Sequence, residues 1–102
     1  MITGGLNVDL AEVERRARSW PELGGAELCV LGVPDPEWGT KVVAATEAGA
    51  DADLAGLRRF LAETVPPYAA PRELVHLGTL PRTSSGKIDR PALRHLLEKG
   101  LP

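Results

Sequence analysis

The sequence predicts an α+β fold: a small three-stranded sheet covered by helices, with an N-terminal β-hairpin and a C-terminal loop that presents a lysine. Three observations support this prediction. Residues 26–33 are dense in Leu and Val, and residues 41–47 and 73–77 are also β-like. Apolar residues recur at helical spacing in three other segments. Glycines and prolines separate these segments, which predicts short elements joined by turns.

The N-terminus predicts a hairpin followed by a helix. Gly4 and Gly5 separate two short β-type pieces and so predict a tight turn. Asp9 is placed to cap the first helix, and Glu12 three positions later completes a capping-box pattern. The apolar face of this helix consists of Leu10, Val13 and Ala17. Residues 21–25, with one proline and two glycines, end the helix.

The middle of the chain predicts two strands joined by a tight connection. Residues 34–36, Pro-Asp-Pro, predict a turn between the strands at 26–33 and 41–47. Strands joined by so short a turn should pair antiparallel. The strand at 73–77 then completes the sheet.

Two further helices are expected to cover the sheet. Asp51 or Asp53 can cap the second helix, and residues 66–67, two prolines, end it. Its buried stripe consists of Leu54, Leu57, Phe60 and Leu61. Asp89 can cap the last helix, in which Pro91 is tolerated because it lies in the first turn. The inward-facing residues of that helix are Leu93, Leu96 and Leu97.

Length and composition limit what the chain can do alone. With 102 residues it is one small domain, which cannot enclose a large substrate pocket. The formal net charge of −2 gives no support for nucleic-acid binding. Neither a long apolar run nor a charged-then-apolar leader is present, which predicts a cytoplasmic protein without a membrane span. The single cysteine, Cys29, lies in an apolar run and is expected to be a small buried residue.

The most informative functional feature is the polar segment of residues 83–87, which ends in Lys87 and is called the lysine loop below. These residues cannot bury much apolar area, so we expect a mobile, solvent-facing loop that carries the Lys87 ammonium to an external anion. Taken alone, the same residues also fit an ordinary surface lysine. A P-loop is excluded, because Ile88 follows Lys87 where Ser or Thr is required.

Other polar residues give weaker signals. Arg82 and Arg90 flank the lysine loop and are expected to be solvated or interface charges. Trp38 predicts a turn with a packed indole. His76 and His95 are far apart in sequence, and no set of three or four convergent ligands is visible. We therefore predict no metal site in this chain.

Four segments of the chain resemble, in order, the signatures of one enzyme superfamily. Residues 80–90 closely resemble the C-terminal lysine motif of adenylate-forming enzymes, which include acyl- and aryl-CoA synthetases, peptide-synthetase adenylation domains and luciferases. Residues 2–14 resemble the glycine-rich hairpin and first helix of the mobile C-terminal domain, and residues 33–39 and 68–72 resemble two further signatures. The resemblance implies that residues 1–102 form a single C-terminal lid domain. The large N-terminal domain that binds ATP and the acid has no counterpart in these residues.

The resemblance also implies a two-step reaction. A carboxylic acid and ATP give an acyl-adenylate and pyrophosphate, and CoA then displaces AMP to give the CoA thioester. ATP and CoA would be co-substrates, with Mg²⁺ accompanying ATP on the absent domain. By resemblance the catalytic residue is Lys87, which would stabilise the charge that develops around the α-phosphate. The isolated chain is expected to be inactive, because it carries neither the nucleotide pocket nor the acid pocket.

The hairpin and the segment after the second helix are implied to contact CoA. In the CoA-ligase members the C-terminal domain rotates after adenylation, withdraws the lysine and brings the hairpin to the active site. The residues that would line the pantetheine tunnel are Gly4, Gly5, Leu6 and Asn7. Tyr68 would pack on the CoA adenine, as an aromatic residue does at this place in some members. Ala69 and Ala70 stand where a basic partner is expected, and Arg72 is the candidate replacement.

The acid and the acceptor are the least determined parts of this interpretation. Residues 4–8 and 70–74 are most similar to o-succinylbenzoate–CoA ligases of menaquinone biosynthesis, which makes o-succinylbenzoate the predicted acid. One alternative is an adenylation domain that loads a carrier protein. Another is a free-standing binding or regulatory module that has no catalytic role. In the leading interpretation the partners are the large N-terminal domain of the same enzyme, a small carboxylic acid and CoA.

Overall fold

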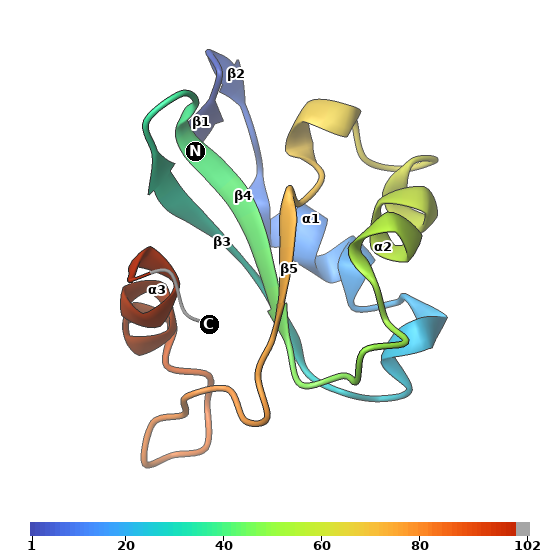
Figure 1. Cartoon of the computed structure of the whole chain (residues 1–102), viewed down its shortest axis with the longest axis vertical. Coiled ribbons are helices and arrows are strands. Elements are labelled where there is room, and N and C mark those ends of the chain that lie inside the picture. Colours follow the sequence, from blue (N-terminus) through green and yellow to red (C-terminus); the bar gives the residue numbers. More distant parts are fainter. Residues whose placement is uncertain (100–102) are drawn as a thin grey trace.

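A mixed sheet of three strands forms the centre of the molecule (Figure 1). The structure is a computed structural model that describes residues 1–99, so residues 100–102 of the predicted domain lie outside the described residues. The strands lie in the order β3–β4–β5, where β3 is Leu28–Asp35, β4 is Gly39–Thr46 and β5 is Glu73–His76. β3 and β4 pair antiparallel, as predicted, and β5 lies parallel to β4. The predicted α+β fold is confirmed.

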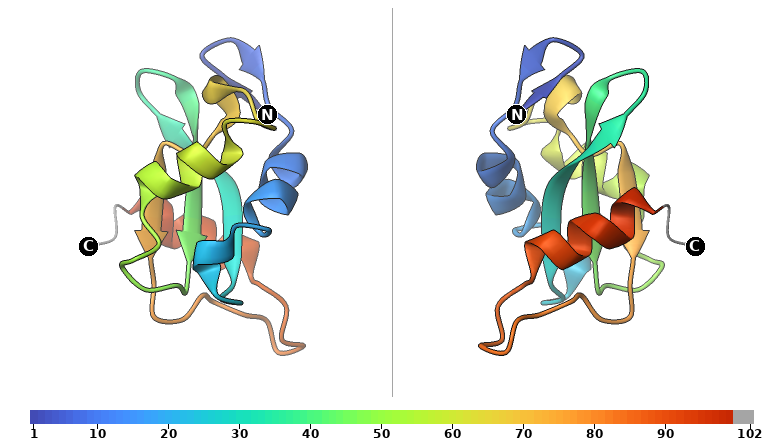
Figure 2. Two further views of the ribbon diagram at one scale, coloured as in Figure 1. Left: turned by 90° about the vertical axis from the view of Figure 1, so that its right-hand side faces the viewer. Right: turned by 90° about the vertical axis from the view of Figure 1, so that its left-hand side faces the viewer.

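Helices cover both faces of this sheet (Figure 2). α1 (Leu10–Ala17) and α2 (Leu54–Leu61) pack on one face, and α3 (Arg90–Glu98) packs on the other. Successive residues of β3 therefore enter two different cores. The larger core includes Val13, Ala17, Leu28, Val30, Val42, Ala44, Leu57 and Leu61. The smaller core contains Cys29, Leu31, Ala45, Leu80 and Leu93. The burial of both faces explains why β3 reads as a continuous apolar run.

Each α-helix begins at a predicted aspartate. The side chain of each aspartate accepts a hydrogen bond from the backbone N–H three residues on, at 3.2 Å for Asp9, 2.8 Å for Asp53 and 3.1 Å for Asp89. The cap of α2 is thus Asp53 and not Asp51. The capping box predicted at Asp9 is only half formed, because the carboxylate of Glu12 pairs with two arginines of its own helix instead.

The turn between β3 and β4 lies later in the chain than predicted. Pro34, expected in the turn, pairs with Thr40 inside the antiparallel ladder. Proline is tolerated there because β3 is an edge strand of the sheet. Asp35 ends the strand, and its carboxylate accepts hydrogen bonds from the N–H groups of Glu37 and Trp38, both at 2.9 Å. These bonds close the turn and lower the pKa of Asp35, and the bond from Trp38 has the larger effect on that pKa.

The hairpin and the lysine loop lie toward opposite ends of the long axis of the molecule, which measures 36 Å (Figure 1). β1 (Ile2–Thr3) and β2 (Leu6–Asn7) form a separate two-stranded antiparallel sheet. The short helix η2 (Pro67–Ala69) lies at the hairpin end (Figures 1 and 2), whereas η1 (Pro21–Leu23) follows α1. The lysine loop projects at the other end, between β5 and α3. The two predicted sites therefore lie at opposite ends of the domain, with the three-stranded sheet between them.

Cys29 is buried, as predicted, and this burial raises the pKa of its thiol. Within residues 1–99, no helix is long and apolar enough to cross a lipid bilayer. In the same described part of the chain, no three His, Cys, Asp or Glu side chains lie together in a way that could hold a metal ion.

Candidate functional site

The lysine loop is a closed turn that ends in Lys87. An isolated antiparallel bridge joins Arg82 to Ile88 at its base. Inside the loop, the N–H of Thr83 donates to the carbonyl of Lys87 (2.8 Å), and the N–H of Gly86 donates to the carbonyl of Thr83 (2.9 Å). Gly86 has a φ of +88°, a conformation that favours glycine strongly. The loop therefore has a defined hydrogen-bonded shape, while its mobility stays a prediction.

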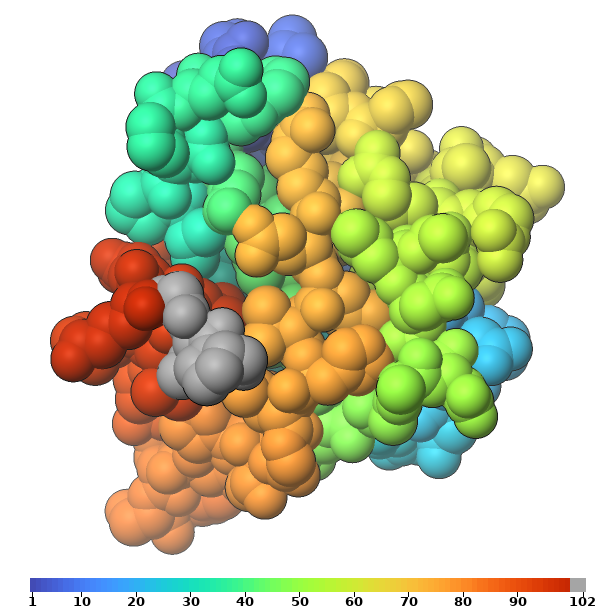
Figure 3. Space-filling view, viewed as in Figure 1, coloured from blue at the N-terminus to red at the C-terminus, as the bar shows by residue number. Residues whose placement is uncertain are grey.

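The Lys87 side chain is available to a partner outside this domain. All residues of the lysine loop are exposed. Among the described residues, no carboxylate forms an ion pair with Lys87. In the space-filling view the loop lies in the orange projection at the lower left (Figure 3). This location fits the solvent-facing cation expected from the sequence.

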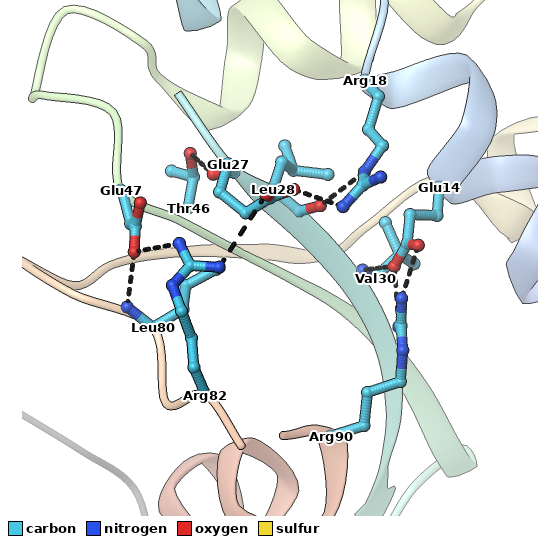
Figure 4. Close-up of polar contacts among 10 residues, drawn as sticks. All are labelled: Glu14, Arg18, Glu27, Leu28, Val30, Thr46, Glu47, Leu80, Arg82 and Arg90. Carbon is cyan, nitrogen blue, oxygen red and sulfur yellow. Dashed lines mark hydrogen bonds and ion pairs between the residues drawn. The ribbon is translucent and has the colours of Figure 1, made fainter. Parts of the chain in front are cut away.

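The segment that leads into the lysine loop is held by Glu47, which directly follows β4 (Figure 4). One carboxylate oxygen, Oε2, accepts the N–H of Leu80 (2.8 Å) and also Nη2 of Arg82 (3.0 Å). Nη1 of Arg82 lies 4.0 Å from Oε2 of Glu27, and the other oxygen of Glu27 pairs with Arg18. Arg82, expected from the sequence to be a solvated or interface charge, is exposed to solvent and also contacts two acidic residues of the body.

The segment that leaves the lysine loop is held by Glu14 of α1 (Figure 4). Arg90, the first residue of α3, donates to both oxygens of this carboxylate, at 2.9 and 2.7 Å. Oε1 of Glu14 also accepts the backbone N–H of Val30 at 2.8 Å. Burial alone would raise the pKa of Glu14, but the hydrogen bonds from Arg90 and Val30 outweigh it and the pKa lies below its ordinary value.

This lowered pKa predicts a pH-dependent contribution to stability. Glu14→Gln is expected to reduce the free energy of unfolding at neutral pH by about 1.5–3 kcal/mol, the range for hydrogen bonds to a charged group. Because the folded-state pKa is lower than the unfolded-state value of about 4.3, the contribution is present above that value and is lost as the pH falls through the folded-state pKa. Denaturant titrations of both proteins over this acid range would measure it. A stability difference that does not shrink in acid would contradict the assignment.

At the other end of the molecule, Gly4 and Gly5 have different surroundings. The N–H of Gly4 donates to the carbonyl of Trp38 (3.0 Å), and a Cβ on Gly4 would lie 2.9 Å from Cε3 of the indole ring. A Cβ on Gly5 would meet no heavy atom within 4 Å. The guanidinium of Arg72 lies 3.9 Å from the centroid of the Trp38 ring. Gly4 is thus required by the packing of the domain itself, whereas the space beside Gly5 is open.

Gly4→Ala is therefore expected to destabilise the fold. Its φ of +55° is left-handed, which costs a residue with a Cβ about 1–2 kcal/mol, and the contact with Trp38 adds to that cost. Gly49→Ala is the control, because φ there is not positive and an added Cβ meets no heavy atom within 4 Å. The control should change the free energy of unfolding by less than about 0.5 kcal/mol. Equal effects at the two positions, measured by denaturant titration, would show that neither the left-handed backbone of Gly4 nor its contact with Trp38 matters for stability.

The other residues expected to contact CoA are exposed at the hairpin end. Leu6 and Asn7 lie on β2, and Leu6 is 47% exposed. Tyr68 lies on η2 and is 37% exposed. The structure therefore brings the hairpin and η2 to one end, where they can share a partner, and places the lysine loop at the other end (Figure 1). Arg72, the candidate basic partner of Tyr68, stacks on Trp38.

The family model described as AMP-binding enzyme C-terminal domain matches residues 12–87. The chain belongs to this family. The match runs from α1 through the whole sheet to Lys87, so the resemblance that the sequence motifs suggested is confirmed. The lysine loop of this chain lies at the C-terminal end of the matched region.

Similar proteins are much longer than this chain. The mitochondrial malonate–CoA ligase of Homo sapiens is 38% identical over 96 residues, which cover 91% of this chain and 16% of that protein. An uncharacterized acyl–CoA ligase of Bacillus subtilis (strain 168) is 35% identical over 101 residues, which cover 99% of this chain and 20% of that protein. A solved fatty acyl CoA synthetase of Mycobacterium tuberculosis has a TM-score of 0.87 at 27% identity, and the match covers 100% of this chain and 20% of that one. The chain thus spans about a fifth or less of each of these proteins.

Sequence reasoning missed Glu14 and Glu47. Both carboxylates are held near the base of the lysine loop, yet neither stands in a motif that points to the loop. The only signal in the sequence is a single acidic residue beside apolar neighbours, which is common on any amphipathic element. Their partners, Arg90 and Arg82, stand out in the sequence because they flank Lys87. The sequence does not indicate which carboxylates they pair with.

Proposed function

We propose that residues 1–102 are the single, mobile C-terminal lid domain of an ATP-dependent acid–CoA ligase. The complete enzyme would convert an acid and ATP into an acyl-adenylate and pyrophosphate, and then form the CoA thioester and AMP. Membership of the AMP-binding enzyme C-terminal domain family supports the class. The observation that carries the proposal is the exposed Lys87 on a closed turn at one end of a domain whose glycine hairpin lies at the other end.

Lys87 would act in the first half-reaction. Attack of the carboxylate on the α-phosphate of ATP gathers negative charge on the oxygens around phosphorus, and a positioned ammonium stabilises this charge. The lysine is exposed, and no carboxylate of the described residues pairs with it, so it can meet a phosphate that another domain presents. The nucleotide, its Mg²⁺ and the acid would be bound by the large domain, and the isolated chain would be inactive.

The hairpin end would act in the second half-reaction. Rotation of the domain would replace the lysine loop by Gly4, Gly5, Leu6 and Asn7, which would line the path of the pantetheine thiol. The open space beside Gly5 supports this role, because bare backbone leaves room for a ligand. Tyr68 would pack on the CoA adenine, with Arg72 as the nearest candidate for its phosphates.

The acid that we propose is o-succinylbenzoate, which would place the enzyme in menaquinone biosynthesis in the cytoplasm. The support is the similarity of residues 4–8 and 70–74 to ligases for that acid. The relative from Homo sapiens is named for malonate and one from Aromatoleum aromaticum for indoleacetate, so similar ligases differ in their acids. The acid must therefore be identified with the complete enzyme, because the large domain holds the acid pocket in the proposed arrangement.

An acceptor assay tests the proposed function. The complete enzyme would be incubated with ATP and a panel of carboxylic acids that includes o-succinylbenzoate and malonate, and then offered free CoA or a holo-carrier protein. We expect pyrophosphate release with one acid and thioester formation with free CoA. Transfer to the carrier protein alone would favour the adenylation-domain alternative. Absence of both products with every acid would favour the binding or regulatory module.

A further inference from the structure

The position of Lys87 depends on the two segments that join the lysine loop to the body. All residues of the loop are exposed, and the bridge between Arg82 and Ile88 joins one side of the loop to the other and not to the sheet. At the bridge or just beyond it, each segment carries an arginine that is bound to an acidic residue elsewhere in the fold: Arg82 to Glu47, and Arg90 to Glu14 (Figure 4). These two contacts tie the segments on either side of the loop to the body of the domain.

The first contact fixes both the backbone and the side chain of the incoming segment. Oε2 of Glu47 accepts the N–H of Leu80 and a guanidinium nitrogen of Arg82, at 2.8 and 3.0 Å. Leu80 is fully buried, so the segment is anchored at its beginning by the smaller core. The Glu47 side chain is only 21% exposed, which limits the number of conformations it can adopt.

The second contact fixes the outgoing segment in orientation as well as in position. Arg90 makes two parallel hydrogen bonds with Glu14, and such a paired geometry holds the planar guanidinium in one orientation. The side chain of Glu14 is 13% exposed and also accepts the N–H of Val30 in β3. One carboxylate thus connects α1, the sheet and the start of α3, although Glu14 and Arg90 are 76 residues apart.

Orientation matters more than stability for a group that must reach an external phosphate. The Arg82–Glu47 pair joins side chains that are 35% and 21% exposed and should contribute little to folding, whereas the Arg90–Glu14 pair contributes through the more buried Glu14, which is 13% exposed. A catalytic cation must nevertheless be held within about 0.5 Å of its productive position, and about 1 Å of misplacement can cost on the order of 10²-fold in rate. Fixed ends shorten the range that Lys87 can explore.

We propose that Arg82 with Glu47 and Arg90 with Glu14 are positioning pairs that aim Lys87 during adenylate formation. This inference rests on the proposed function, because it requires Lys87 to act on the α-phosphate. A positioning role differs from a purely structural role in one respect, because positioning pairs influence catalysis only through Lys87. Loss of a pair therefore has no additional effect on adenylation once Lys87 is removed.

The test is a double-mutant cycle in the complete enzyme. Arg90→Gln and Arg82→Gln are each made in the wild-type and Lys87→Ala backgrounds, with Arg15→Gln as the control, since Arg15 is in a surface ion pair with Glu12 on α1. We expect each loop-arginine variant to slow pyrophosphate release about tenfold in the wild-type background and to have no further effect with Lys87→Ala. Thioester formation from supplied acyl-adenylate and CoA should stay at the wild-type rate in all of them.

The outcomes separate this inference from the proposed function. If Lys87→Ala adenylates at the wild-type rate, the proposed role of Lys87 fails. If Lys87→Ala is impaired but the arginine variants are not, or if the effects of the two substitutions multiply, the positioning inference alone is overturned. Should Arg90→Gln fold poorly, Glu14→Gln replaces it, because this substitution preserves the shape of the other side chain of the same pair while removing its charge. The same non-additivity with Lys87→Ala is then expected.

Discussion

Replacing Lys87 by alanine should slow adenylate formation by on the order of 10²-fold or more and leave thioester formation from supplied acyl-adenylate intact. The two half-reactions differ because the lysine would lie at the phosphate in only one orientation of the domain. The exposed turn that carries Lys87 and the hairpin lie at opposite ends of the fold, so both cannot contact one site together. Pre-steady-state measurements of each half-reaction in the complete enzyme would provide the comparison.

A second exposed lysine supplies the control for this experiment. Lys99 follows α3 and is exposed, so Lys99→Ala removes the same charge away from the lysine loop and should leave both half-reactions unchanged. Acetylation of Lys87 should reproduce the alanine phenotype, because it removes the ammonium charge while retaining the chain length. Equal losses in adenylation and thiolation would instead show that Lys87 supports the structure and not the chemistry.

The secondary structure was predictable because its signals are local. An aspartate just before a segment of helical periodicity is visible in the sequence. Such an aspartate caps each of the three α-helices. The apolar strands were equally clear. The error at Pro34 has a specific cause: proline usually marks a turn, and only the edge position of β3 lets it remain in the ladder.

The candidate site was predictable only as a set of positions. The motif resemblance selected Lys87, Gly4 and Gly5, but the difference between the two glycines depends on an indole from a distant turn. The pair formed by Arg90 and Glu14 likewise joins residues from opposite ends of the chain. Such contacts follow from the order of strands and helices in space. No local pattern of residues encodes them.

Gly5→Leu should have the converse phenotype of Lys87→Ala. A leucine in the open space beside Gly5 would obstruct the proposed path of the CoA thiol, so adenylate should form at the wild-type rate and accumulate while thioester production falls by on the order of 10²-fold. The φ of Gly5 is +83°, so leucine also strains the turn. The folding of the variant must therefore be measured together with its activity.

Gly25→Leu isolates the effect of that strain. Gly25 has a φ of +87°, and an added Cβ there also meets no heavy atom within 4 Å, so the backbone cost should match that at Gly5. If both variants lose similar stability but only Gly5→Leu blocks thiolation, strain is excluded as the cause and the hairpin is assigned to the thiol path. If Gly5→Leu slows adenylation as much as thioester formation, the two ends of the domain do not serve alternate states, and Gly5 is required only for the turn.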